Sequence, residues 1–527
     1  MFADLHNHNH SRTYLWLRPW MKKHERKGAF HPWTVIASNM RARKKGGMAS
    51  AYGQSDLVKL WNGKVRLTFN ALYPIEKGFF KSTVFKTKND PKRAIIGFAS
   101  HHDLPLRDLL QGFVMRLPQP MINHIQSDAY DYWEALNEEY RFLLTKNGQL
   151  TRNRIQMPGL IRSILESKRK RRRRFPRLLN ANGAYQIPTN KAELEQLLAE
   201  NKIVMILTIE GMHAIGTDTS SPDQWKKRVD HIKKQWQHPV FFITFAHHFD
   251  NKLCGHAHSF PDIAAKKVPL LDQRERLNGS FTPEGRLIIR KLLSLDAQNN
   301  PKPSEGYRIL IDVKHMSALS RKEYYNEIVR PCLQKGDIIP VIASHCGYSG
   351  RSTLDELIIK RNEEKDDYFA NGPFYAWNIN VCDEDIRMIF DTEGLFGLSF
   401  DQRIVGVPSK QKKEGGLNTL ESLWNNLEAV VKVIFNANDI PENQKPKIWE
   451  RLTLGSDFEG YIDPVNPYPT ALEYDKFKTD LIALMEEKRK SNGNPLFGLK
   501  TKTSIEKVVE KLCFENAGNF VRKWYRN

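Results

Sequence analysis

Strand-length apolar runs recur along the chain, and most of them are continuous rather than alternating. Continuous runs rich in Val, Ile, Leu and Phe are typical of strands that are buried on both faces. Between most of the runs lie segments whose apolar residues have helical spacing. This alternation predicts a parallel α/β sheet of eight strands with helices between them. The predicted strands are Phe2–Leu5, Val65–Leu72, Ile203–Ile209, Val240–Phe245, Arg308–Val313, Ile338–Ala343, Leu395–Phe400 and Leu452–Gly455, and the helical segments include Pro283–Leu295, Arg321–Leu333, Asp383–Phe390 and Leu420–Phe435.

Most of these strands terminate, at their C-terminal ends, in residues that can bind metal ions. In a closed parallel barrel those ends open onto one face, which is where barrel enzymes place their chemistry. A single histidine at a strand end is more often structural, but one shared site explains why so many strands end in this way. The strand-end residues are His6 and His8, Glu210, His247 and His248, His315, His345 and Asp457.

The ligand types indicate two transition-metal ions rather than one. Imidazole and carboxylate together suit zinc or another divalent transition ion, whereas Ca²⁺ and Mg²⁺ prefer oxygen ligands. Residues two apart on a strand point the same way, so His6 and His8 can bind one cation. Four histidines and one glutamate exceed a single tetrahedral site with an open position, but two cations bridged by Glu210 would use them all. The other histidines are expected to be structural or to line the pocket wall, namely His10, His213, His248, His256 and His258.

Composition and charge bear on the partners of the protein. The 527 residues include 81 Lys and Arg against 60 Asp and Glu, a net charge of +21, and 40% are hydrophobic, which excludes a disordered chain. A basic tract runs from Lys168 to Arg174, and such a tract is usually a solvated segment. Nucleic acid is the alternative partner, but neither interleaved aromatic residues nor a DNA-binding motif surrounds the tract, so the sequence does not favour it.

The five cysteines lie far apart and include no Cys-x-x-Cys pair, which is typical of a reduced protein. No segment approaches the roughly 18 to 20 apolar residues of a membrane-spanning helix, and no signal peptide follows Met1. We therefore expect a cytoplasmic protein without a membrane span. The sequence leaves homo-oligomerisation open.

The motifs in combination resemble those of the membrane (renal) dipeptidase family of metallopeptidases, within the amidohydrolase superfamily. Asp4-Leu5-His6-Asn7-His8 is similar to the superfamily's opening His-x-Asp or His-x-His. The later motifs follow in the family's order, and the resemblance spans nearly the whole chain. It implies a (β/α)8 barrel of the TIM type. The matching segments are Thr208–Gly211, Phe281–Leu295, Ile311–Ser317, Ala343–His345, Leu454–Gly460 and Asn516–Phe520.

On this barrel the long connections are insertions. They cover about residues 9–60, 84–195 and 346–375, of which 84–195 is charge-rich and mostly helical. Residues 503–527 are expected to form an amphipathic C-terminal helix on the barrel exterior. The resemblance implies that residues 1–527 form a single metal-dependent hydrolase barrel, and no tandem repeat of 20 to 50 residues is visible in the chain.

The resemblance also implies a role for each site residue. His6, His8 and Glu210 would hold one cation, and Glu210, His315 and His345 the other, with zinc the expected metal. The implied activity is cleavage of a small peptide or amide bond by a water molecule that two bridged divalent cations activate.

Two further residues would complete the chemistry. Asp457 would face the metal-bound water or the departing amine as a general acid or base. His247 matches the family's histidine that steadies the oxygen of the tetrahedral intermediate, which makes it both catalytic and substrate-binding.

The sequence departs from the family at two places. The family commonly has Asp where this chain has His8, an exchange that keeps a ligand but removes a negative charge. The arginine that grips the substrate carboxylate in the family is replaced by Ile379, and candidates for its substitute are Arg351 and Arg361.

Three alternative functions stay open. The first is an amidohydrolase that acts on a lactone, a cyclic amide or an N-acyl amino acid. The second is a phosphoesterase, because the opening motif also resembles polymerase-and-histidinol-phosphatase enzymes. The third is a basic nucleic-acid-binding or scaffolding protein with a vestigial site.

Overall fold

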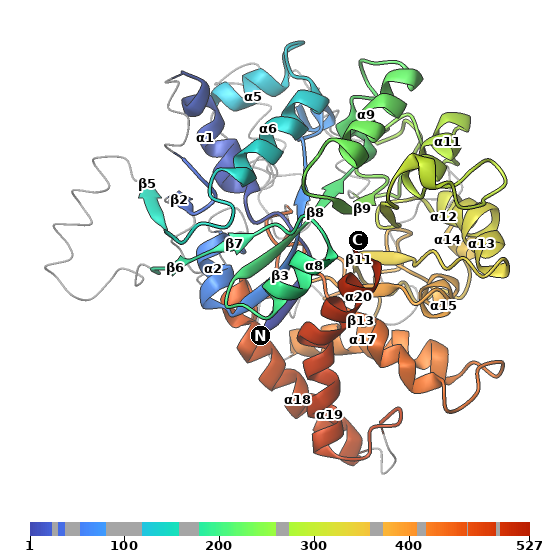
Figure 1. The fold of residues 1–527 in the computed structure, drawn as a ribbon. Helices are drawn as coiled ribbons and strands as arrows, with labels where there is room; N and C mark the ends of the chain where they lie inside the picture. Colours follow the sequence, from blue (N-terminus) through green and yellow to red (C-terminus); the bar gives the residue numbers. More distant parts are fainter. Residues whose placement is uncertain are drawn as a thin grey trace, which may run out of the picture.

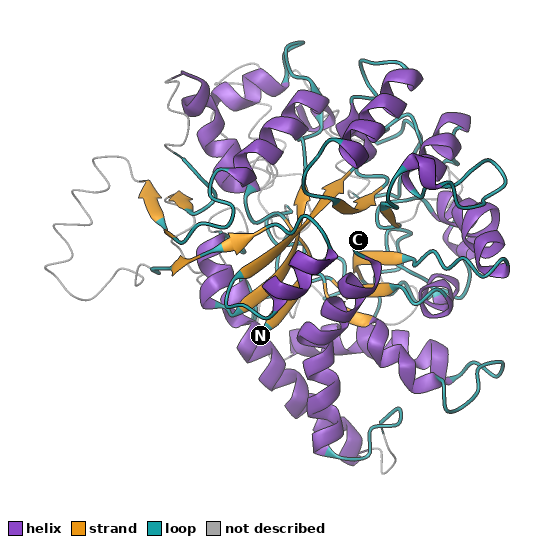
Figure 2. Ribbon diagram, viewed as in Figure 1, coloured by secondary structure: helices purple, strands orange, loops and turns teal. Residues whose placement is uncertain are grey.

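The computed structural model describes residues 1–23, 30–36, 53–80, 119–156, 179–259, 273–358, 373–407, 418–460, 462–491 and 496–526. Eight strands of its central sheet are parallel neighbours in the order β1-β3-β8-β9-β10-β11-β12-β13. Figure 2 shows these strands at the centre with helices around them. The strands are β1 (Phe2–Asn7), β3 (Val65–Leu72), β8 (Ile203–Glu210), β9 (Val240–Thr244), β10 (Leu310–Asp312), β11 (Ile342–Cys346), β12 (Leu395–Leu398) and β13 (Leu452–Leu454).

The sheet closes on itself where the segment after β13 meets β1. Asn7 and Phe458 form a parallel bridge. The amide of Asp457 donates to the carbonyl of His6 at 2.9 Å, and the amide of His8 donates to the carbonyl of Phe458 at 2.9 Å. The predicted (β/α)8 TIM-like barrel is therefore confirmed.

Each predicted apolar run contributes to one strand of the barrel. Only β11 is shifted relative to its predicted range, because its paired residues begin at Ile342 rather than at Ile338. The apolar residues Ile339 and Val341 are buried, but they precede the paired part of the strand. Val341 nevertheless accepts a backbone hydrogen bond from Leu395 at 3.1 Å. The strands β1 and β8 run beyond their predicted ends, so that His6 and Glu210 lie within the sheet itself.

Helices surround the barrel (Figure 1), and the connection from β3 to β8 also carries α5, α6 and short strands. One of these strands, β5 (Arg154–Gln156), pairs with β2 (Thr34–Ile36), which lies between β1 and β3 in the chain. In addition, β4 (Thr151–Arg152) pairs with β6 (Asn182–Gly183), and β7 (Tyr185–Gln186) pairs with β8. The helices are α1 (Ser11–Lys23), α2 (Leu57–Asn62), α5 (Gln119–Ile125), α6 (Tyr132–Leu144), α8 (Lys191–Leu198), α9 (Pro222–Lys234), α11 (Pro283–Leu292), α12 (Ala318–Tyr324), α13 (Arg330–Gln334), α14 (Leu354–Leu357), α15 (Asp383–Asp391), α17 (Asn418–Phe435), α18 (Tyr474–Ser491), α19 (Lys502–Glu510) and α20 (Asn516–Trp524).

The C-terminal helix α20 packs against the apolar interior of the barrel. Phe69 on β3 and Phe242 on β9 stack at 6.1 Å across the intervening strand, which places both rings inside the barrel. The ring of Phe520 contacts Phe241 at 5.8 Å, and Ala517 belongs to the same buried cluster. The helix thus covers the end at which β9 begins, opposite to the end that carries the strand-end histidines.

None of the helices in the described part of the chain is long and apolar enough to cross a membrane. The five cysteines are all buried and none forms a disulfide.

Candidate metal centre

The carboxylate of Glu210 lies at the centre of a group of five imidazoles. Glu210 is the last residue of β8, and the imidazoles follow or end β1, β9, β10 and β11. The structure therefore brings together all the strand-end residues that the sequence analysis named as ligands. From Oε1 of Glu210 the distances are 3.3 Å to His6 Nε2, 3.6 Å to His315 Nε2 and 3.7 Å to His345 Nε2, and from Oε2 they are 3.0 Å to His8 Nε2 and 3.4 Å to His247 Nε2.

Local backbone irregularities occur at several of these residues. The pairing of β1 with β3 shifts register between Asp4 and Asn7, the stretch that contains His6. His315 and Asp457 have φ values of 65° and 62°, a left-handed conformation that non-glycine residues rarely adopt. Such strain is concentrated at functional sites, where the surrounding structure maintains it.

Two buried aspartates outside the predicted ligand set hold the strand ends in place. Asp312 accepts hydrogen bonds from the amide of Ser344 at 3.0 Å and from its hydroxyl at 2.5 Å. Asp4 accepts from the amide of Ser456 at 2.9 Å and from its hydroxyl at 2.6 Å. Each of these serines directly precedes a site residue, so the aspartates fix His345 and Asp457. Burial raises the pKa of both aspartates.

His8 and His345 point Nε2 toward Glu210 while their other ring nitrogen is engaged. Nδ1 of His8 lies 3.1 Å from the carbonyl of Ala71, and Nδ1 of His345 lies 2.8 Å from the hydroxyl of Ser344. Metal-binding histidines almost always have such an outer partner, which fixes the tautomer and the ring orientation.

Glu76 is the corresponding partner of His247, and sequence analysis missed it. Its Oε2 lies 2.6 Å from Nδ1 of His247, and its Oε1 accepts from the amide of Phe249 at 3.1 Å. Burial alone would raise the pKa of Glu76, but His247 and His213 outweigh it and lower that pKa to about 2. Burial by itself would lower the pKa of His247, but the carboxylates of Glu210 and Glu76 outweigh burial and raise that pKa. Glu76 belongs to no recognised motif, so only its position after β3 could have suggested it.

Asp457 lies at the open side of the group. Its oxygens are 3.8 Å from Nε2 of His6 and 3.9 Å from Nε2 of His345, and its side chain is 13% exposed. Burial and the charge of Glu210 raise its pKa well above the ordinary range. A carboxyl group whose pKa is raised in this way, at the open side of the group, is placed for proton transfer.

The donor set fits divalent cations. Ligand atoms of His6, His8 and Asp457 lie within 4.8 Å of one another, and so do those of Glu210, His315 and His345. Among the described residues, Nε2 of His6, Nε2 of His8 and Oε1 of Glu210 have no hydrogen-bond partner. Buried polar atoms are normally satisfied, so atoms left over at one point indicate a ligand that the protein itself does not supply.

The remaining histidines that the sequence analysis named have local partners. Nε2 of His10 lies 2.8 Å from Glu139, and Nε2 of His213 lies 2.8 Å from the carbonyl of Pro74. His256 approaches two backbone carbonyls, and the ring of His258 stacks on Trp377 at 4.5 Å. His248 instead contacts His247 and His315.

The candidate substrate arginines are not both within the described residues. Arg351 follows β11 and is partly exposed, with its carbonyl accepting from the amide of Asp383 at 3.0 Å. Arg361 and the basic tract Lys168–Arg174 lie outside the described residues.

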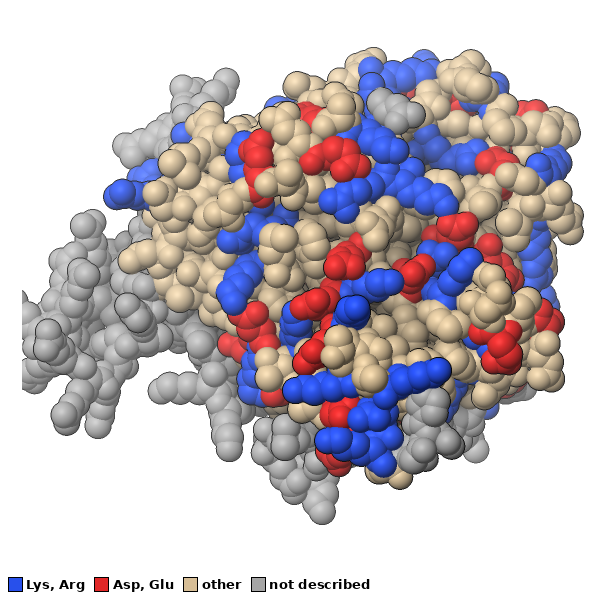
Figure 3. Space-filling model, turned by 60° about the horizontal axis from the view of Figure 1, so that its bottom comes forward, with Lys and Arg blue, Asp and Glu red and all other residues tan. Residues whose placement is uncertain are grey.

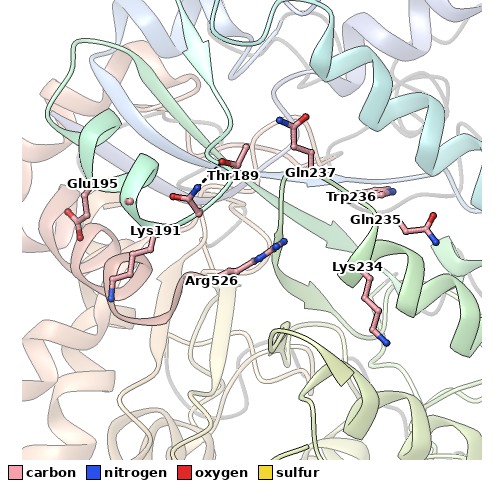
Figure 4. A pocket seen from close by; sticks show the side chains of 10 residues that line it. Thr189, Lys191, Glu195, Lys234, Gln235, Trp236, Gln237 and Arg526 are labelled. Carbon is pink, nitrogen blue, oxygen red and sulfur yellow. Dashed lines mark hydrogen bonds between the residues drawn. The ribbon is translucent and has the colours of Figure 1, made fainter. Parts of the chain in front are cut away.

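Two surface features lie apart from the centre. On the face shown in Figure 3, Lys and Arg side chains lie among Asp and Glu side chains. Figure 4 shows an open hollow near the start of β9, lined by residues that include Lys191, Lys234 and Arg526. None of the predicted site residues lines this hollow.

No protein-family model and no curated protein matches the chain. Solved structures that resemble it include the dipeptidase AC, described as a metallo peptidase, with 13% identity, coverage of 99% of this chain and 98% of the other, and a TM-score of 0.48. A metallo peptidase from Rhodobacter sphaeroides, liganded with a phosphinate mimic of the dipeptide L-Ala-D-Ala, is 14% identical with 99% coverage of both chains and a TM-score of 0.46. The probable dipeptidase PvdM from Pseudomonas aeruginosa is 14% identical, with 96% and 98% coverage and a TM-score of 0.40. At these low similarities, function has to be inferred from the site itself.

Proposed function

We propose that this chain is a metal-dependent hydrolase that cleaves small peptide or amide bonds. The observation that carries the proposal is the Glu210 carboxylate, which five imidazole nitrogens approach within 3.0 to 3.7 Å. The order of the motifs along the chain, which resembles that of the membrane dipeptidase family, selects the amide bond among hydrolase substrates.

In this proposal Glu210 would contribute a ligand to each of two divalent cations, with zinc the expected metal. His6 and His8 would hold one cation, and His315 and His345 would hold the other. When bound, such a pair lowers the pKa of a water molecule and polarises a carbonyl group.

The residues around the pair orient the substrate and move protons. His247, held by Glu76 at 2.6 Å, donates a hydrogen bond from Nε2 to the substrate oxygen that gains negative charge. Asp457 would transfer a proton to the leaving nitrogen, because its carboxyl group lies at the open side of the centre, 3.8 Å from His6 and 3.9 Å from His345. The five reduced, buried cysteines fit a cytoplasmic location.

A phosphoesterase is the second candidate, and a positively charged residue favours it. Nζ of Lys314, next to His315, is buried and has no hydrogen-bond partner among the described residues. A buried ammonium group is costly unless an anion pairs with it. With His8 in place of a carboxylate, the centre is more positive than the family pattern, which suits a more anionic substrate.

The test is elemental analysis of the purified protein followed by a hydrolysis panel with and without chelator. The panel contains L,L- and L,D-dipeptides, N-acyl amino acids, lactones and phosphomonoesters. Two equivalents of metal and chelator-sensitive dipeptide cleavage are expected. Phosphoester cleavage without peptide cleavage would favour the second candidate, and absence of bound metal would contradict both.

A further inference from the structure

We propose that His247, His248 and His315 form a further position for a divalent cation, beside the pair that Glu210 bridges. The three residues offer ligand atoms that lie within 4.8 Å of one another. This position goes beyond the proposed function, in which His247 acts on the substrate directly and His248 has no role.

The three rings pack together from two neighbouring strand ends. His247 and His248 follow β9, and His315 follows β10. The ring centroids are 3.9 Å apart for His247 and His248, 4.9 Å for His248 and His315, and 4.6 Å for His247 and His315. Three imidazoles with a remaining open position form a ligand set that zinc enzymes use for catalysis.

Outer contacts orient two of these rings as they orient the ligands around Glu210. Nδ1 of His247 lies 2.6 Å from Glu76, and Nδ1 of His248 lies 2.8 Å from the hydroxyl of Ser259. Ser259 is itself held by the side-chain amide of Gln273 at 2.7 Å. A carboxylate or hydroxyl on Nδ1 leaves Nε2 as the nitrogen for a cation, which is the usual arrangement in metal sites.

His315 connects this position to the bridged pair. Its Nε2 lies 3.3 Å from Nε2 of His345 and 3.6 Å from Glu210. Its Nδ1 is buried and has no hydrogen-bond partner among the described residues. His315 therefore belongs to both ligand groups, and the additional cation would share this ligand with the bridged pair. Because one of its three ligands is shared, the additional cation should bind more weakly than the pair.

Occupancy of this position changes the role of His247. Without the additional cation, its Nε2–H donates directly to the substrate oxygen. With the cation bound, Nε2 would have released this proton to solvent and would be a ligand, and the positive charge beside the substrate would come from the cation instead. The pocket then holds a charge that suits a more anionic substrate.

The test is a Co²⁺ titration of the full-length, chelator-stripped protein, followed by equilibrium dialysis, elemental analysis and visible absorption. The variants are His248→Gln, which can keep the contact to Ser259, and Glu210→Gln, which impairs the bridged pair. His258→Gln is the matched control, because it removes a buried histidine that stacks on Trp377. We expect three equivalents in the wild type and in His258→Gln, and two in His248→Gln with loss of one set of absorption bands.

Two measurements keep the outcome decisive. Glu76→Gln should weaken only the last equivalent, by about 10- to 100-fold, as expected for an outer partner of a ligand. Anomalous diffraction from Co²⁺-loaded wild-type crystals needs no variant and should show a peak between His247, His248 and His315. The proposal is wrong if the wild type and His248→Gln bind the same number of cations with the same spectrum. A failure of the proposed function would appear separately: Glu210→Gln would then bind as many cations as the wild type, which would show that Glu210 bridges no pair.

Discussion

Replacing Glu210 by glutamine tests the proposed function at its centre. The substitution keeps the size and shape of the side chain but removes its negative charge and one of its two acceptor oxygens. Because Oε1 faces His315 and His345 and Oε2 faces His8, the loss reaches both proposed cations. The neighbouring imidazoles keep their outer contacts, so the binding positions themselves should persist.

The size of the effect follows from how directly Glu210 would contact the metals. Loss of an outer partner of a metal ligand typically weakens binding by about 10- to 100-fold. Loss of a ligand that two cations share should weaken the binding of each cation by more than this factor, which corresponds to more than roughly 1.4 to 2.7 kcal/mol per cation. Turnover, which needs both cations, should fall by at least about 10²-fold.

The assay is metal content after dialysis against metal-free buffer, together with chelator-sensitive dipeptide hydrolysis. Glu139→Gln is the matched control, since Glu139 is a buried glutamate that contacts an imidazole, His10, at 2.8 Å without belonging to the candidate ligand set. We expect the control to retain its metal. Full metal content and undiminished hydrolysis in Glu210→Gln would refute the bridging role.

Three further predictions address other residues of the site. Asp457→Asn should retain the metals but lower kcat by about 10²- to 10⁴-fold, measured by elemental analysis and steady-state kinetics; metal loss instead would make Asp457 a ligand. Its neighbours lower the pKa of Glu76 from 4.5 to about 2, so the ionised carboxylate should contribute about 3 kcal/mol to the free energy of unfolding. This contribution should be present above pH 4.5 and disappear as the pH falls toward 2. Urea unfolding of the metal-free protein should show a larger loss of unfolding free energy between pH 7 and pH 3.5 in the wild type than in Glu76→Gln. Equal losses in the two proteins would count against the pairing of Glu76 with His247. Lys314→Met should raise the free energy of unfolding of the metal-free protein by about 1 to 3 kcal/mol, because it removes a buried, unpaired ammonium group; a lower unfolding midpoint would show that Lys314 has a stabilising partner.

The barrel could be predicted because its strands are buried on both faces. Their continuous apolar runs are visible without knowledge of any partner strand, and the helical segments between them imply parallel pairing.

The placement of α20 could not be predicted in the same way. Its apolar stripe indicates that one face is buried, but many barrel surfaces could cover that face. Contacts such as that between Phe520 and Phe241 join positions far apart in the sequence.

The residues that orient the site were missed for a related reason. Asp4, Glu76 and Asp312 act through hydrogen bonds to residues on or after other strands, and nothing in their local sequence separates them from ordinary buried carboxylates. Histidines at strand ends are recognisable because several occur at equivalent places in the fold. An orienting carboxylate becomes recognisable only when its partner is known to lie within about 3 Å.

The geometry around Glu210 also distinguishes the two histidines of the opening motif. Parity along β1 assigns His6 and His8 to one cation, and their ligand atoms are close enough for that arrangement. Yet His6 stacks on His345 at 4.0 Å and approaches Oε1, while His8 approaches Oε2 together with His247. The two histidines of the opening motif are therefore not equivalent. His8 lies on the side of Glu210 that His247 shares, and His6 lies on the side of the other two ligands, so the exchange of a carboxylate for His8 changes the charge next to the histidine that would contact the substrate.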